Sequence, residues 1–321
     1  MPSPPSLRGT QVLVTGAAGF IGTHLGRALG AAGASVCGLD LRPSPNGAPA
    51  PWFTADIRDI PPRALRGMRL DVVVHLAAIV GVEAAAADPA ATRSVIVDGT
   101  ARVLAAARHV GDPTVLYLSS SEVYGEAAAL PITEDTPLRP RSPYGAAKAE
   151  AEELVAEYGR DSGAAVTVIR PFNVYGPGQR ADFVVPRFVG RALAGQPLPV
   201  VSDGAQLRTF TYVDDLVHGV LAALVRRGPA GRTYNVGGAD ARTVADLAAL
   251  VIAETGGDAQ VVAGLDPAEL GRPAETEIRN RVASSRRAHR ELGFTPRISL
   301  RDGVREVVRA EAASRALARA E

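Results

Sequence analysis

The chain has 321 residues, of which 46% are hydrophobic and 21% charged, with 35 Lys and Arg against 34 Asp and Glu. A net charge of +1 gives no reason to expect a surface for nucleic acid or for an anionic membrane, although the arginines could cluster locally, and no apolar run is long enough to cross a bilayer. The length suits one large α/β domain or two smaller lobes. Without a signal-type N-terminus, and with Cys37 alone in an apolar run, we expect a reduced, soluble, cytoplasmic protein.

A glycine motif follows the first predicted strand, at residues 11–15. The glycines are spaced G-x-x-G-x-x-G and open an amphipathic helix that runs to about Ala32. In this context glycine permits a tight turn and lets the backbone approach a pyrophosphate, which then faces the free N–H groups of the helix N-terminus. The motif predicts a dinucleotide site formed by Gly16, Gly19, Phe20, Ile21 and Gly22.

The next two strands end in carboxylates. The second strand, residues 35–39, leads into Asp40, which can accept both ribose hydroxyls of NAD and would repel the 2′-phosphate of NADP. NAD is therefore favoured, although Arg42 keeps NADP possible. A short strand at about 52–55 leads into Asp56 and Ile57, which either hydrogen-bond an adenine ring or, for Asp56, cap a helix.

Polar residues follow the strands predicted at the centre of the sheet. Residues 71–78 form a continuous apolar run, in which we interpret His75 as a packed strand-end residue. A long helix is predicted at about 90–109, then a strand at 114–118 that ends in Ser120, Ser121 and Glu122. Open α/β sheets build their sites at these carboxyl ends, so the three side chains are candidates for chemistry.

Tyr144 and Lys148 lie four residues apart at the start of an alanine-rich helix that continues to about Arg160. Helical spacing puts them on one face. A phenol ordinarily titrates near ~10 and a lysine near ~10.4, but a nearby ammonium stabilises the phenolate and moves it toward neutral pH. The spacing occurs by chance on many helices, so its meaning depends on the other motifs.

The order of strands and helices predicts a doubly wound parallel α/β (Rossmann) sheet with a smaller C-terminal substrate-binding lobe. A strand at 165–169 runs into an irregular Gly- and Pro-rich loop at 170–178, a natural exit from the first lobe. We assign residues 1–172 to the cofactor domain, with returning segments near 202–237, and residues 173–201 and 238–321 to the lobe. Further helices are expected at 183–194, 213–227, 243–255 and 300–319, and strands at 198–201 and 233–236.

Taken together, these motifs, with Leu76-Ala77-Ala78 and Arg170-Pro171-Phe172-Asn173, resemble the extended short-chain dehydrogenase/reductases of the NAD-dependent epimerase/dehydratase family, from Gln11 to about Arg309. The resemblance implies NAD as cofactor and a nucleotide sugar, most simply a UDP-sugar, as substrate. It makes Tyr144 the base that removes the proton of the sugar 4-hydroxyl. Lys148 would lower the phenol's pKa and hold the nicotinamide ribose, and Ser120 would donate a hydrogen bond to the reacting oxygen.

The same resemblance implies contacts farther from the reacting atoms. Leu76, Ala77 and Ala78 would line the cofactor, Asn173 would contact the substrate, and Arg208 and Arg272 would bind the pyrophosphate, for which guanidinium is well suited. It also implies a homodimer through helices 90–109 and 144–160, whose apolar residues include Ala151, Leu154 and Val155. No metal site is expected.

Two positions depart from the family pattern. Ile96 stands where the family usually has an asparagine that positions the lysine through water, so either Asp98 compensates or the cofactor geometry is looser. Ser284 replaces the usual aspartate and could still cap the helix before Leu292.

The reaction depends on the fate of a 4-keto sugar. A 4-epimerase needs no further acid or base and is ranked first. A UDP-glucuronate decarboxylase or a dehydratase would need another group near C5, for which Glu122 beside Ser121 is the candidate. The common 4,6-dehydratases carry an aspartate where this chain has Ser121, which argues against that reaction in its ordinary form. A ketoreductase and a non-catalytic nucleotide-binding protein are ranked below these.

Overall fold

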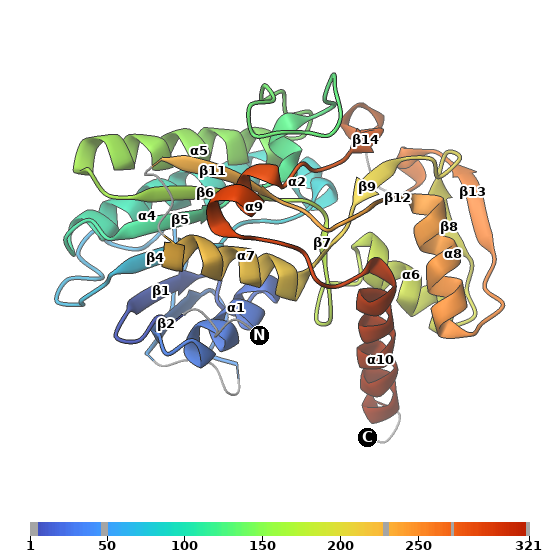
Figure 1. The fold of residues 1–321 in the computed structure, drawn as a ribbon, viewed down its shortest axis with the longest axis horizontal. Helices are drawn as coiled ribbons and strands as arrows, with labels where there is room; N and C mark the ends of the chain where they lie inside the picture. The colour runs from blue at the N-terminus through green and yellow to red at the C-terminus, as the bar shows by residue number, and fades with distance from the viewer. Residues whose placement is uncertain (1–5, 46–50, 227–230, 271–272, 319–321) are drawn as a thin grey trace.

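Seven parallel strands form the central sheet of the protein (Figure 1). The structure is a computed structural model and describes residues 6–45, 51–226, 231–270 and 273–318. The strand order, β11-β6-β5-β4-β1-β2-β3, is that of a doubly wound sheet and confirms the predicted fold class. The strands are β1 (Gln11–Thr15), β2 (Ser35–Asp40), β3 (Trp52–Thr54), β4 (Val72–His75), β5 (Thr114–Leu118), β6 (Val166–Pro171) and β11 (Arg232–Val236).

Helices cover both faces of this sheet because its strands are apolar on both sides. In β1, Val12 and Val14 belong to one hydrophobic cluster and Leu13 to the other. The first cluster packs under α1 (Phe20–Ala31), α7 (Val213–Arg226) and α9 (Arg286–Leu292), and the second under α4 (Gly99–Arg108) and α5 (Pro143–Ser162). Cys37 is buried in the second cluster, and burial raises the pKa of its thiol to about 11.

The helix predicted at 90–109 is interrupted. Its residues form α3 (Pro89–Arg93), a π-helical turn η1 (Ser94–Asp98) and then α4, and the short α2 (Val82–Ala87) precedes them. Within the turn the Thr100 hydroxyl donates to the Ile96 carbonyl oxygen. Gly99 lies against Ile57, since a Cβ on this glycine would be 2.5 Å from Ile57 Cδ1. The wide turn therefore sits where the helix passes over the chain between β3 and β4.

The remaining elements form the smaller lobe beside the carboxyl ends of the strands (Figure 1). A third hydrophobic cluster fills it, contributed mainly by α6, α8 and α10. Its helices are α6 (Val184–Leu193), α8 (Val244–Thr255) and α10 (Leu300–Ala318), and its short strands are β7 (Val174–Tyr175), β8 (Leu198–Val201), β9 (Leu207–Thr209), β10 (Thr211–Tyr212), β12 (Ala241–Thr243), β13 (Val261–Leu265) and β14 (Asn280–Arg281).

The chain passes more than once between sheet and lobe. After β8 to β10 it returns through α7 and β11, and β11 pairs with β6 along its whole length. Later, Ala288, Leu292 and Phe294, on and just after α9, pack in the cluster beneath α7. Residues 286–294 therefore lie beside the sheet, although we assigned 238–321 to the lobe. The rest of that division stays a proposal.

Two further observations concern the described parts of the chain. No helix there is long and apolar enough to cross a membrane. No group of three or more His, Cys, Asp or Glu side chains among the same residues is arranged to hold a metal ion.

Candidate active site

The carboxyl ends of neighbouring strands bring the predicted cofactor residues together. Gly16 follows β1 with a φ of 70°, a conformation that favours glycine. A Cβ on Gly16 would lie 2.8 Å from the Ala77 backbone nitrogen, and one on Gly22 would lie 2.2 Å from the Gly16 carbonyl oxygen. The glycine turn thus packs directly on α1 and on the Leu76–Ala78 segment after β4, as a close-approach dinucleotide loop requires.

The first turn of α1, which follows the glycine turn, presents backbone donors. Gly19 is the N-cap of α1 and supplies no side chain, and the first turn of the helix contains no acidic residue. Asp40, at the end of β2, accepts a hydrogen bond from the Ala18 amide at 2.9 Å and one from the Arg42 amide at 3.0 Å. The Arg42 guanidinium itself donates to the Ala18 carbonyl oxygen. These residues fit a bound dinucleotide, with N–H groups for a pyrophosphate and a carboxylate for a ribose.

Asp56 and Ile57 have different surroundings in the structure. The Asp56 carboxylate accepts hydrogen bonds from the Arg58 amide at 2.8 Å and from the Arg58 guanidinium, whose hydrogen bond lowers the pKa of Asp56. Residues 57–59 form a turn and not a helix, so the helix-cap interpretation is wrong. Ile57 is buried against Gly99. The adenine contact stays a prediction.

Helix α5 begins where its sequence indicates. Ser142 is the N-cap, and its hydroxyl accepts a hydrogen bond from the Gly145 amide at 3.1 Å, with Pro143 in the first turn. A Cβ on Gly145 would lie 2.7 Å from the Glu122 carbonyl oxygen. The start of α5 is therefore packed against the short 3-10 helix η2 (Ser121–Tyr124), which follows β5. This contact brings Tyr144 beside Ser120.

Burial dominates the titration of Tyr144, which is 7% exposed. Desolvation raises the pKa of Tyr144, and the Glu122 charge adds to this, whereas the Ser120 hydroxyl and the Arg281 charge lower it. We expected Lys148 to lower the phenol's pKa, but here that effect comes from Ser120 and Arg281. The action of Lys148 on Tyr144 stays a prediction.

Lys148 is 2% exposed, and its side chain donates a hydrogen bond to the Leu118 carbonyl oxygen at 2.7 Å. Its ammonium lies 4.6 Å from the centre of the Tyr117 ring. Burial lowers the pKa of Lys148 to about 7, against an opposing effect of the Glu152 carboxylate one turn along α5. Lysine is thus placed to change its charge within the physiological range.

His75 is a packed residue, as its position predicts. Its Nδ1 lies 2.6 Å from the Thr15 hydroxyl and its Nε2 lies 3.0 Å from the Thr100 hydroxyl. Burial, assisted by the Lys148 charge, lowers the pKa of His75 to about 3, so the imidazole is neutral. The Thr15 hydroxyl also accepts from the Leu76 amide at 3.2 Å, which ties this buried network to the cofactor segment.

Glu122 forms a buried ion pair that the sequence did not suggest. Its partner is Arg281 on β14, 159 residues away, and the two side chains are 10% and 11% exposed. The Glu122 Oε2 and Arg281 Nε atoms are both buried and have no hydrogen-bond partner among the described residues. Ser121, the neighbouring candidate, is 2% exposed. Glu122 is therefore fixed by the smaller lobe beside Tyr144.

The predicted substrate residues lie at the junction of sheet and lobe. Asn173 has a φ of 39°, and its side-chain amide donates to the Thr209 carbonyl oxygen at 2.8 Å. Arg208 is 9% exposed, donates to the Arg279 carbonyl oxygen at 2.9 Å, and pairs with Glu277 at 3.2 Å. Arg272 lies outside the described residues. The structure thus anchors Asn173 and Arg208 to the backbone of the lobe.

The structure bears on both departures from the family pattern. Asp98 pairs with Arg93 at 3.7 Å and its side chain is 57% exposed, so the first alternative, compensation by Asp98, is wrong, and the looser cofactor geometry stays a prediction. Ser285 and not Ser284 precedes α9, and its hydroxyl accepts from the Gly237 amide at 3.0 Å without capping the helix. The expected cap by Ser284 is also wrong.

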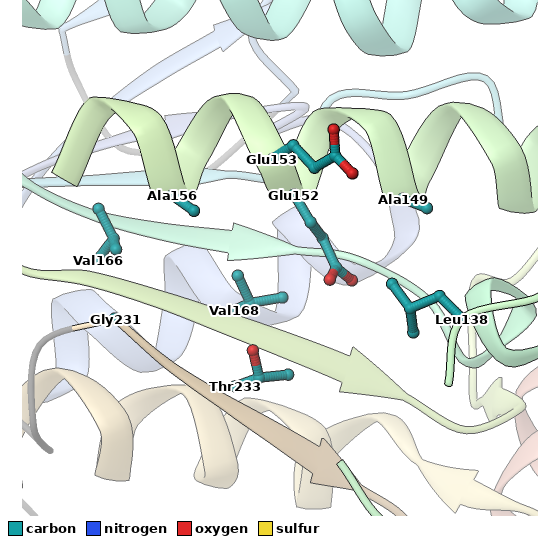
Figure 2. Close-up of a pocket in the computed structure, with 9 residues that line it drawn as sticks. All are labelled: Leu138, Ala149, Glu152, Glu153, Ala156, Val166, Val168, Gly231 and Thr233. Atoms are coloured by element: carbon teal, nitrogen blue, oxygen red, sulfur yellow. The ribbon is translucent and has the colours of Figure 1, made fainter. Parts of the chain in front are cut away.

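A separate pocket lies farther along α5 (Figure 2). It has a volume of about 220 Å³ and is bounded mainly by apolar side chains of α5 and β6, together with Thr233 of β11 and the preceding Gly231. Glu152 contributes to the wall, but its carboxylate is paired with Arg170 at 2.5 Å. None of the predicted catalytic side chains lines this pocket, which sets it apart from the active site.

Comparison with known proteins shows the family of the chain. A model of the NAD dependent epimerase/dehydratase family matches residues 12–237. The chain belongs to this family. A dTDP-glucose 4,6-dehydratase of Streptomyces griseus is 36% identical over 93% of both chains, and a UDP-glucose 4-epimerase of Mycolicibacterium smegmatis is 33% identical over 93% of this chain and 97% of its own. The structure of MoeE5 in complex with UDP-glucuronic acid and NAD superposes with a TM-score of 0.87 at 33% identity, covering 95% of this chain and 99% of that one.

Membership of the epimerase/dehydratase family confirms two predictions. The protein is an NAD-dependent enzyme of nucleotide-sugar type, and NAD is its cofactor. The relatives include both an epimerase and a dehydratase, so the family does not by itself decide which product is formed.

Proposed function

We propose that the protein is a nucleotide-sugar 4-epimerase that acts through a transient 4-keto sugar. The supporting observation is the set of ionisable groups around Tyr144. Ser120, Glu122 and Arg281 act on the phenol, and Glu122 is the carboxylate that does so among the described residues; it is held by Arg281, and Lys148 lies one turn along the same helix. Oxidation at C4 requires a base for the hydroxyl proton, and this set supplies one.

Each chain residue has a defined task in this proposal. Tyr144 takes the proton of the 4-hydroxyl and later returns it, while the Ser120 hydroxyl donates a hydrogen bond to the same oxygen. NAD supplies the acceptor and donor of the C4 hydride. Lys148, as an ammonium, stabilises the phenolate form of Tyr144 and binds the ribose beside the nicotinamide. The burial of Tyr144 and Lys148 excludes water from the exchange.

Glu122, the carboxylate that acts on Tyr144 among the described residues, favours epimerisation over elimination of water. A dehydratase must remove the C5 proton with one group and protonate the departing C6 hydroxyl with another. Ser121 occupies the position next to Glu122 and cannot serve as that acid at neutral pH. Glu122 accepts a hydrogen bond from a guanidinium, an arrangement suited to an acceptor and not to a proton donor. Epimerisation needs neither group.

The substrate that we propose is a UDP-hexose or UDP-uronate. The similarity to a UDP-glucose 4-epimerase and to MoeE5, solved with UDP-glucuronic acid, supports this class. Asn173 and Arg208 would bind the sugar and the pyrophosphate at the edge of the lobe, with Arg272 as the second phosphate arginine.

A lyase is the second candidate. The unpartnered Oε2 of Glu122 is a free acceptor in the site, as a base for C5 would require, and the similarity to the Streptomyces griseus dehydratase supports the same reaction. UDP-glucuronate decarboxylation is the other outcome of this class, and Arg281, paired with Glu122, would be the cation for a C6 carboxylate.

Product analysis separates these reactions. The protein is incubated with UDP-glucose, UDP-galactose, UDP-glucuronate and dTDP-glucose, and the products are resolved by mass and by chromatography. We expect an isomer of unchanged mass, formed without net change in added NADH. Loss of water or of carbon dioxide would establish a lyase instead, and net oxidation of NADH with an added 4-keto nucleotide sugar would establish a ketoreductase.

We also propose a homodimer, as the family resemblance implies, although the expected interface is less apolar than the sequence indicated. Ala151 and Val155 are fully buried against the protein's own sheet, and Leu154 is half-buried, so these residues offer less free apolar surface than we expected. Light scattering at micromolar concentration tests the proposal, and a monomer would contradict it.

A further inference from the structure

Lys148 is the only lysine in the chain, since the other 34 of its 35 basic residues are arginines. In the family an asparagine usually positions this lysine through water, and that asparagine is missing here. Ile96 stands at the asparagine position, is fully buried, and its carbonyl oxygen accepts the Thr100 hydroxyl. The ammonium must therefore be positioned by other groups.

Two groups on β5 contact the ammonium directly. The Leu118 carbonyl oxygen accepts its hydrogen bond at 2.7 Å, and the Tyr117 ring centre lies 4.6 Å from Nζ. Tyr117 is fully buried, with its ring 5.6 Å from that of the neutral His75. A cation over an aromatic face is stabilised most strongly where water is excluded, as it is here.

We propose that Tyr117 is the positioning residue for Lys148: its ring, with the Leu118 carbonyl oxygen, holds the ammonium in place and in its charged form, which is the task of the missing asparagine. This inference rests on the proposed role of Lys148 in the epimerase. Tyr117 acts only through the lysine and does not itself touch the reacting atoms.

The other groups around the ammonium make the ring important. Glu152, on the same helix, favours the charged lysine, but its two oxygens are bonded to Arg170 at 2.9 and 2.5 Å, which offsets its charge. His75, from β4, is neutral, and Tyr144, from α5, has its pKa raised by burial and is uncharged at neutral pH. The ring is therefore a main source of stabilisation for the cation against desolvation.

A chain with one lysine permits a direct measurement. The protein is produced with lysine labelled by ¹³C at Cε, with any tag free of lysine, and the single Cε signal is followed by NMR from pH 5 to 10. The variants are Tyr117→Leu, which removes the ring, and Tyr117→Phe, which keeps the ring and removes only the hydroxyl. Tyr117→Met, which fills more of the space, replaces Tyr117→Leu if that variant unfolds.

We expect the lysine midpoint of Tyr117→Phe to match that of the wild-type protein, and that of Tyr117→Leu or Tyr117→Met to fall by about one pH unit, the size of a desolvated cation–π contact. The alkaline limb of kcat should move down by the same amount. A midpoint that is unchanged or raised without the ring, or one that falls equally in Tyr117→Phe, would overturn the proposal. The NMR titration requires no turnover, so it separates this outcome from failure of the proposed epimerase activity, which product analysis reports.

Discussion

Two pairs of polar side chains meet at the active site, and they are built in different ways. Tyr144 and Lys148 lie one turn apart on a single helix, so local sequence determines their spacing. Glu122 and Arg281 are separated by 159 residues and meet only because β14 of the smaller lobe packs over η2. The proton-transfer groups thus belong to the sheet domain, whereas the pair placed to affect the product depends on docking of the lobe.

The largest expected effect concerns the first pair. Tyr144→Phe should reduce turnover by about 10²–10⁴-fold, since it removes the proposed base and leaves the helix intact. Steady-state epimerisation of the substrate found by product analysis gives the measurement. Tyr158→Phe is the matched control, because Tyr158 lies on the same helix and its hydroxyl donates to the Pro113 carbonyl oxygen at 3.1 Å, away from the proposed catalytic groups. Equal losses in both variants would remove the special role of Tyr144.

The second pair should matter more for stability than for an epimerase's chemistry. Glu122→Gln leaves the Arg281 charge buried without its partner and should lower the free energy of unfolding by about 3–5 kcal/mol. Turnover should change by less than about tenfold. Urea unfolding and kinetics measure the two effects, and Glu122→Gln combined with Arg281→Met should recover much of the stability. A loss of turnover as large as that of Tyr144→Phe would favour the lyase.

The buried lysine should leave a signature in the pH dependence of stability. The pKa of Lys148 falls from 10.5 to about 7 on folding. Between pH 7 and about 8.5 the unfolded chain therefore binds more protons, and the free energy of unfolding rises with pH. Lys148→Met should flatten this rise, as urea midpoints across the window would show. This pH window ends below the range in which Cys37 titrates. Folding raises the pKa of Cys37, so its titration makes the free energy of unfolding fall as the pH rises. An unchanged slope in Lys148→Met would mean that the lysine is not buried as described.

A local feature of the smaller lobe gives the smallest effect. Thr243 and Asp246 form a reciprocal capping box at the start of α8, with Asp246 N to Thr243 Oγ1 at 2.9 Å. Thr243→Ala should lower the free energy of unfolding by about 1 kcal/mol and leave turnover unchanged, whereas Thr243→Ser should retain the cap. Thermal unfolding compares the three proteins. A change in kcat would show that α8 is coupled to the site.

The contrast between contacts set by local sequence and contacts between distant segments explains which features the sequence could predict. The long apolar strands and the capped start of α5 follow from local patterns, as do Gly16, Asp40 and the Tyr144–Lys148 spacing. The π-helical turn at Ile96 and the strands β9, β12 and β14 have no local signature, because two or three residues show no period. Arg281 could not be identified from the sequence because its partner, Glu122, is distant along the chain. The anchoring of Arg208 could not be predicted because this side chain binds the backbone of another segment.

The return of the chain to the sheet has a consequence for synthesis on the ribosome. The edge strand β11 is residues 232–236, whereas its neighbour β6 is complete at Pro171. For some sixty residues of elongation β6 is therefore an apolar strand with an unpaired edge, the kind of surface that recruits other chains. Only part of the smaller lobe, α6 with β7 to β10, is synthesised within this interval, whereas α8 and α10 follow β11, so the sheet edge is covered before the lobe can be complete.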